Sequence, residues 1–285
     1  MPLAVERVGR LAVLVAAGLS VLAGVAMLVM HLSTDPLVDA RAYYDAATRL
    51  NAGQPLYPVD ASPTGAYLYP PLLAILFRPL ALLPFPVAAA AWETVVLAAT
   101  GLTIRRIGFG SKVRLALAFL ALPLAWALAI GQAEPVVMLL LAIGSPWSVA
   151  LAGSVKLFPW LAALHWAGRR DVRSLAVFTA WVAGLAAVQL VLEPAGTLAY
   201  LRLEWLHPAF DVRNFSLYAV HPLAWGVALL AIAVLAVLTA RSKAGWPLAV
   251  VLVVAAAPRL LVYQLITLLA GFGGPRARSD GGSAR

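Results

Sequence analysis

The 285-residue sequence contains no cysteine and few charged residues. The absence of cysteine excludes disulfides, thiolate metal sites and cysteine nucleophiles. Asp, Glu, Lys and Arg make up only 12% of the chain, whereas soluble domains usually carry about 25%. Because 63% of the residues are hydrophobic, we predict a membrane protein.

Several signatures of nucleotide and hydrolase sites are also missing. Neither G-x-x-x-x-G-K-[ST] nor G-x-G-x-x-G occurs, so no cradle for a nucleotide phosphate is predicted. G-x-S-x-G and H-E-x-x-H are absent as well. The four histidines show no metal spacing. We therefore expect no cofactor, although a divalent metal held by carboxylates from distant segments stays open.

Long apolar runs dominate the rest of the chain, and several approach the ~20 residues that cross a bilayer. They predict an all-α polytopic transmembrane bundle, with one domain over residues 1–272 and a disordered tail at 273–285. The first run is too long for a signal peptide and is expected to be a retained helix. The predicted spans are 11–30, 86–104, 114–130, a broken region at 134–168, 174–192, 222–240 and 246–270.

Two of these regions contain breaks with a basic residue nearby. Lys156 lies in the 134–168 region, close to Phe158–Pro159, and Arg259 follows Pro258 inside the last run. Broken helices at membrane depth are tolerated where they line a cavity. Snorkelling to the interface is the alternative for Lys156, but its apolar neighbours favour contact with an anionic ligand.

Basic residues are concentrated in three short loops, at 105–114, 169–173 and 241–243. These loops are predicted to be cytoplasmic. We interpret the net charge of +9 through these loops, whose basic residues set the topology and contact anionic lipid headgroups. No nucleic-acid partner is therefore expected. The loops at 31–84, 131–134 and 193–221 then lie outside. Residues 70–84, too short for a span, are expected to form an interfacial helix.

The external loop at 31–84 holds four of the 12 acidic residues: Asp35, Asp39, Asp45 and Asp60. Ionisable groups beside a membrane are costly, which favours a functional role. Asp39 precedes a plausible amphipathic helix, so a helix N-cap is the alternative for it. Asp35 and Asp60 are expected in turns, and Asp45 on a solvated face.

Four motifs carry a resemblance to a known family. They are D-x-x-x-Y-Y-x-A-A-x-x-L-x-x-G-x-P-L-Y at 39–57; Y-L-Y-P-P-L-x-A-x-L-x-x-P-L-x-L-L-P at 67–84; G-Q at 131–132 with A-G-x-x-K-x-x-P at 152–159; and N-x-S at 214–216 with A-P-R-x-x-x-Y at 257–263. In these motifs the chain resembles glycosyltransferase family 87, of the polytopic GT-C type.

The resemblance implies inverting transfer of a sugar, commonly mannose, from a polyprenyl-phosphate donor to a glycolipid or cell-envelope glycan acceptor. The reaction would take place on the external (periplasmic) face of the cell membrane, among membrane lipids. Asp39 matches the first-loop acid that acts as base. Lys156, Arg259 and Arg213 are expected to bind the donor phosphate. The residues expected to bind substrate are Tyr43, Tyr44, Tyr67, Tyr69, Gln132, Asn214 and Tyr263.

Two other classes of function stay open. Broken helices around Lys156 would suit a carrier or flippase for a polyisoprenoid or small solute. The large acidic loop and the lack of an internal repeat argue against that reading. Members of the family are usually longer, so an inactive, truncated member acting as a subunit is the third possibility.

Overall fold

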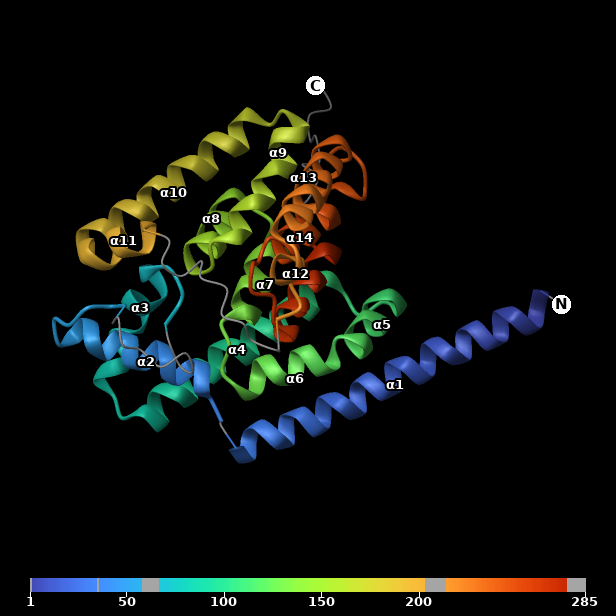
Figure 1. The fold of residues 1–285 in the computed structure, drawn as a ribbon, viewed down its shortest axis with the longest axis horizontal. Coiled ribbons are helices and arrows are strands. Elements are labelled where there is room, and N and C mark those ends of the chain that lie inside the picture. The colour runs from blue at the N-terminus through green and yellow to red at the C-terminus, as the bar shows by residue number, and fades with distance from the viewer. Residues whose placement is uncertain (1, 35, 58–66, 203–213, 276–285) are drawn as a thin grey trace, which may run out of the picture.

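The computed structural model describes residues 2–34, 36–57, 67–202 and 214–275, and in these parts every regular element is a helix. The all-α prediction is therefore confirmed (Figure 1). In chain order the elements, with η for 3-10 helices, are α1 (Pro2–Thr34), α2 (Val38–Asn51), α3 (Pro71–Phe77), η1 (Leu80–Leu82), α4 (Phe85–Ile107), α5 (Ser111–Phe119), α6 (Ala121–Ala129), α7 (Glu134–Ile143), α8 (Pro146–Val155), η2 (Phe158–Ala163), α9 (Leu164–Arg169), α10 (Val172–Leu192), α11 (Pro194–Leu201), α12 (Leu217–Val220), α13 (Pro222–Leu238), α14 (Gly245–Ala255) and η4 (Val262–Phe272).

Within the described residues, α1, α4 and α10 contain apolar stretches long enough to cross a membrane, and the bent pair α5–α6 can form a fourth span. Each coincides with a predicted span. α1 and α10 bury only 11% and 6% of their most apolar windows, so most of their surface is available to lipid. These helices make the chain a polytopic membrane protein.

The bend between α5 and α6 measures 61° and has a local cause. Pro123 has no N–H to donate to the carbonyl of Phe119, one turn earlier, so the helix cannot continue unbroken there. The hydroxyl of Ser20 on α1 donates to that carbonyl at 2.8 Å. At Gly24, a Cβ would lie 2.8 Å from the carbonyl oxygen of Ala121, so only glycine allows α1 this close to α6.

The 134–168 region, predicted to be broken, is interrupted at two points. α7 ends at Gly144, whose φ of 64° is unfavourable for other residues, and α8 begins with Pro146. The chain is extended at Lys156 before η2 begins at Phe158. The last apolar run likewise separates into α14 and η4, which pack against each other, and η4 also packs against α7.

The segment at 70–84 differs from the single interfacial helix that was expected. It forms two short helices, α3 and η1. Pro71, Leu72 and Leu73 of α3 are buried, and α3 contacts α2, α8 and α10. The Leu72 N–H donates to Gln189 Oε1 of α10 at 3.1 Å. α3 is thus mainly an internal packing element, with Leu76 56% exposed, whereas Leu82 of η1 is 77% exposed.

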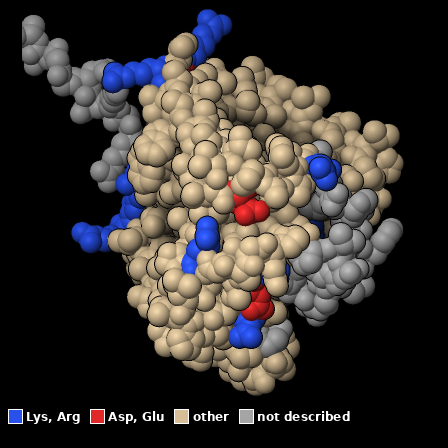
Figure 2. Space-filling model, turned by 90° about the vertical axis from the view of Figure 1, so that its left-hand side faces the viewer, with Lys and Arg blue, Asp and Glu red and all other residues tan. Residues whose placement is uncertain are grey.

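The loops that the charge pattern assigns to opposite sides are also separated in the fold. α2, α3 and α11 are grouped at one side of the bundle (Figure 1), where the Tyr57 and Tyr200 rings lie 6.2 Å apart. Figure 2 shows this side, on which acidic and basic side chains form isolated spots on a largely uncharged surface. Arg106 belongs to the basic 105–114 segment, which is predicted to be cytoplasmic. It donates to the carbonyls of Ala142 and Ile143 at the C-terminal end of α7. Which side faces the cell exterior stays a prediction.

Candidate active site

The N-terminus of α2 is docked on the end of α6, and this contact places Asp39. The N–H groups of Asp39 and Ala40 both donate to the carbonyl of Ile130, at 3.0 and 3.2 Å. Leu37, with φ of 58°, precedes the helix. Asp39 therefore lies in the first turn of α2, and the N-cap interpretation is wrong. A carboxylate in this turn is stabilised by the positive end of the helix dipole.

The G-Q turn after α6 supplies the partner of Asp39. Gln132 is fully buried, and its Nε2 donates to Asp39 Oδ2 at 2.5 Å. Its Oε1 accepts hydrogen bonds from the Tyr43 hydroxyl at 2.6 Å and the Tyr69 hydroxyl at 3.2 Å. The amide thus connects the acid of α2 with two tyrosines from separate segments.

Gly131 allows this turn to fit between α2 and α4. Its φ is 68°, and a Cβ there would lie 2.6 Å from the Cβ of Ala40 and 2.9 Å from Oε1 of Glu93. The Trp92 indole N–H donates to the Gly131 carbonyl at 2.7 Å. No hydrogen bond to Glu93 Oε1 is found within the described residues.

Beside this network lies a buried ion pair. Lys156 Nζ is 2.5 Å from Oε2 of Glu134, and the Thr267 hydroxyl donates to the other oxygen of that carboxylate. Lys156 Nζ also lies 5.0 Å from the ring centre of Tyr69 and 5.3 Å from that of Tyr263. Lys156 thus lies beside Tyr69 and Tyr263, and its charge is already balanced by Glu134.

Sequence reasoning missed Glu134 and Thr267. The available signal was an acidic residue at the start of an apolar helix, combined with a single lysine in the broken region that follows. A buried charge requires a partner, and Glu134 is the nearest acid that precedes Lys156 in sequence. Glu134 is also the first residue of α7, where the positive end of the helix dipole stabilises a carboxylate.

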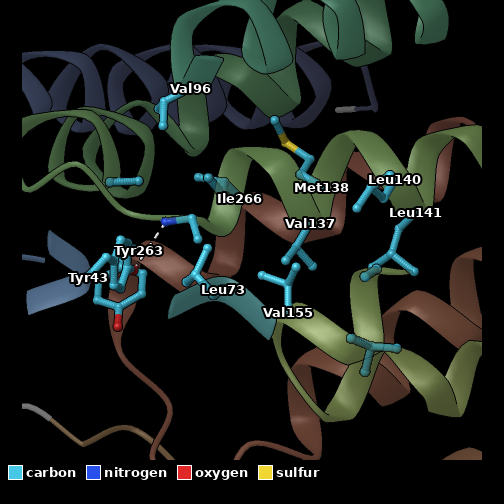
Figure 3. Close-up of a cluster of buried hydrophobic side chains, with 14 of the residues drawn as sticks. Tyr43, Leu73, Val96, Val137, Met138, Leu140, Leu141, Val155, Tyr263 and Ile266 are labelled. Carbon is cyan, nitrogen blue, oxygen red and sulfur yellow. Dashed lines mark hydrogen bonds between the residues drawn. The ribbon is translucent and has the colours of Figure 1, made fainter. Parts of the chain in front are cut away.

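The tyrosines of the first two motifs divide into separate environments. Tyr43 and Tyr67 are buried, and Tyr43 packs edge-on against Tyr67, Tyr69, Phe77 and Trp92. Figure 3 shows Tyr43 and Tyr263 at one end of the buried cluster and Leu140 and Leu141 at the other. Burial, above all, raises the pKa of Tyr43 well above its ordinary value of 10.0, so its hydroxyl stays a donor.

Tyr44 and Tyr67 have hydroxyl partners outside the Gln132 network. The Tyr44 hydroxyl donates to the Leu83 carbonyl at 2.8 Å, and its ring packs on Phe85 at the outer edge of α2. The Tyr67 hydroxyl donates to the Pro70 carbonyl at 2.6 Å. Because Tyr43 and Tyr67 are enclosed by protein and Tyr44 lies apart, the sugar contacts expected for these three residues stay predictions.

Asn214 forms hydrogen bonds with the backbone of the A-P-R-x-x-x-Y motif at 257–263. Its Nδ2 donates to the Pro258 carbonyl at 3.2 Å, and its Oδ1 accepts from the Leu260 N–H at 3.0 Å. The N-x-S and A-P-R-x-x-x-Y motifs are therefore physically joined, with half-buried Arg259 between the two clamped positions. Arg213, Asp35 and Asp60 lie outside the described residues.

No group of three or more His, Asp or Glu side chains that could hold a metal occurs in the described parts of the chain. An apolar depression of about 380 Å³ lies on α10, lined by Trp181, Leu185 and Val188 among others. None of the residues of the Asp39 and Lys156 networks lines it. The polar network, rather than this depression, is therefore the candidate active site.

Comparison with known proteins agrees with these motifs. Residues 67–266 match glycosyltransferase family 87. The "Polyprenol-phosphate-mannose-dependent alpha-(1-2)-phosphatidylinositol pentamannoside mannosyltransferase" of Mycolicibacterium smegmatis (strain ATCC 700084 / mc(2)155) is 34% identical over 155 residues, covering 47% of this chain and 38% of that relative. No solved structure matches the chain. The family match begins after Asp39, whose proposed role therefore rests on its geometry and motif. The chain belongs to glycosyltransferase family 87.

Proposed function

We propose that this chain is a membrane glycosyltransferase that moves mannose from a polyprenyl-phosphate donor to a glycolipid or glycan acceptor. The single observation that carries the proposal is the Asp39 carboxylate, held by the buried amide of Gln132 beside Lys156 and two tyrosines. The family membership and the mannosyltransferase relative support the reaction class and the donor. The charge pattern of the loops supports an active site on the external face of the cell membrane.

In this mechanism Asp39 is the general base. The acceptor hydroxyl oxygen attacks the anomeric carbon while its proton passes to the Asp39 carboxylate. The bond from the anomeric carbon to the phosphate oxygen breaks, and polyprenyl phosphate leaves with that electron pair. Attack from the face opposite the phosphate inverts the anomeric configuration.

The leaving phosphate gains negative charge, so cations near it stabilise the transition state. Lys156, Arg259 and Arg213 are the proposed cations. Because Glu134 balances Lys156, we propose that the phosphate shares the ammonium with Glu134 and that the arginines add the net positive charge. The aromatic faces of Tyr69 and Tyr263 beside Lys156 keep this cation in place without adding negative charge.

The test is donor turnover by the purified protein in lipid nanodiscs, with polyprenyl-phosphate-[³H]mannose and a phosphatidylinositol mannoside acceptor. Asp39→Asn is expected to lower the rate by about 10²–10⁴-fold, the usual effect of losing a general base. Asp45→Asn is the matched control, because Asp45 lies on the same helix in an exposed pair with Arg41. Its rate should stay within about twofold of wild type, since exposed ion pairs contribute little.

Other outcomes would favour the other classes of function. If Asp39→Asn keeps more than about a tenth of the activity, Asp39 is not the base. Absence of turnover combined with movement of the donor lipid between leaflets would identify a carrier. Turnover that appears only with a partner protein, and does not depend on Asp39, would identify a subunit.

A further inference from the structure

The buried amide of Gln132 can adopt only one orientation. Three donors converge on Oε1: the hydroxyls of Tyr43 and Tyr69 and the N–H of Ala133, at 2.6, 3.2 and 2.8 Å. A carbonyl oxygen can accept all three bonds, whereas an amide nitrogen in its place could donate to the two hydroxyls, which also accept, but would face the Ala133 N–H donor to donor. The NH₂ group is thereby directed at Asp39, with Nε2 2.5 Å from Oδ2.

We propose that Gln132 is a positioning residue for Asp39, and that the Ala133 N–H and the Tyr43 hydroxyl together hold its amide in this orientation. Turning over would bring the amide oxygen against the carboxylate and the NH₂ against the Ala133 N–H, and neither contact is a hydrogen bond. This inference rests on the proposed role of Asp39 as base, and it replaces the substrate contact expected for Gln132. A donor to a carboxylate favours the charged form, which is the form that a general base needs.

The site contains other groups that can affect the ionisation of Asp39. Lys156, Tyr43 and Tyr263 interact electrostatically with Asp39. In the described parts of the chain, charged and titratable groups face the site from several packed elements: Tyr43 on α2, Tyr69 before α3, Glu93 on α4, Glu134 on α7, Lys156 after α8 and Tyr263 on η4. Gln132→Leu changes none of these groups, so a changed titration of Asp39 would report the lost amide.

The experiment observes Asp39 directly by ¹³C NMR of protein labelled at the aspartate carboxyl carbon. The chain has seven aspartates, and the Asp39 signal is the one that Asp39→Asn removes. In Gln132→Leu we expect the titration midpoint of Asp39 to rise by about one pH unit, because the charged form loses a donor. Tyr43→Phe should raise it less, since Tyr69 and Ala133 still hold the amide.

Tyr67→Phe is the matched control. It also removes a hydroxyl from a buried tyrosine, but that hydroxyl bonds Pro70 and Ala74 rather than Gln132. The titration midpoint of Asp39 in Tyr67→Phe should equal that in the wild-type protein. The acid limb of the pH–rate profile should move with the NMR midpoint in every variant, which a purely structural defect would not cause.

The outcomes separate this inference from the proposed function. An Asp39 midpoint unchanged in folded Gln132→Leu overturns the positioning role, even if Asp39 is the base. If Gln132→Leu does not fold, an unchanged midpoint in Tyr43→Phe overturns it instead. If the midpoints rise as expected but Asp39→Asn keeps its activity, the positioning geometry is right and the assignment of Asp39 as base is wrong.

Discussion

Removing one partner of the Glu134–Lys156 pair should destabilise the protein strongly. The two side chains are only 6% and 10% exposed, and Nζ lies 2.5 Å from Oε2. Lys156→Met keeps the apolar stem but leaves a buried carboxylate that still accepts from the Thr267 hydroxyl and has lost its countercharge. Breaking a buried pair in this way typically costs about 3–5 kcal/mol. We expect the free energy of unfolding to fall by that amount.

The reciprocal variant should cost less. Glu134→Gln keeps an amide oxygen near Lys156, and the Tyr69 and Tyr263 rings remain at 5.0 and 5.3 Å. Each such cation–π contact contributes about 0.5–2 kcal/mol. The double variant Glu134→Gln/Lys156→Met contains neither charge, and replacing both members of a buried pair is often close to neutral. It should therefore be more stable than Lys156→Met alone.

The assay is denaturant-induced unfolding in one detergent, followed by tryptophan fluorescence and circular dichroism, for wild type and the three variants. The exposed pair Arg41–Asp45, with side chains 54% and 48% exposed, provides the control. Arg41→Met should change stability by less than about 1 kcal/mol. The reasoning is refuted if Lys156→Met is as stable as Arg41→Met, or if the double variant is no more stable than Lys156→Met.

Two further predictions concern topology and the G-Q turn. In an otherwise cysteine-free chain, a cysteine at Thr48 should react with a membrane-impermeant maleimide in intact cells and one at Ser111 should not; the reverse pattern would place α2 inside the cell. Gly131→Ala should destabilise the fold by about 1–3 kcal/mol in thermal unfolding, because φ is 68° and the new Cβ would collide with Ala40. Gly101→Ala is the control, because a Cβ at Gly101 on α4 would meet no other atom, and it should not lower the stability. Equal losses of stability in the two variants would show that the G-Q turn is not constrained.

Much of the fold could be predicted because its signals are local. Apolar runs of sufficient length gave α1, α4 and α10, and prolines at the starts of α3, α7, α8 and α13 mark helix beginnings in sequence. The break at Gly144 has a local cause in Gly144 itself and in Pro146, two residues later. The 61° bend between α5 and α6 also has a local cause, in Pro123, although no bend was predicted there.

The site was predicted less completely because its contacts are tertiary. Helical periodicity could have assigned Tyr43 to the buried face of α2 with Ala40, Ala46 and Ala47, and Tyr44 to its edge. No spacing rule predicts that the Tyr69 hydroxyl donates to Gln132 or that the Tyr69 ring packs against Lys156, which comes from another segment. The same holds for Thr267, which meets Glu134 only through the packing of η4 on α7.

The bond between Glu134 and Thr267 has a consequence for how the protein is made. Thr267 follows Glu134 by 133 residues, so a ribosome must complete α14 and reach η4 before the carboxylate receives this donor. Membrane helices enter the bilayer in order of synthesis, and contacts distant in sequence form late. The hydrogen-bond network around Glu134 is therefore completed only after η4 has been synthesised, and chains released before η4 should reach the membrane without the Thr267 bond.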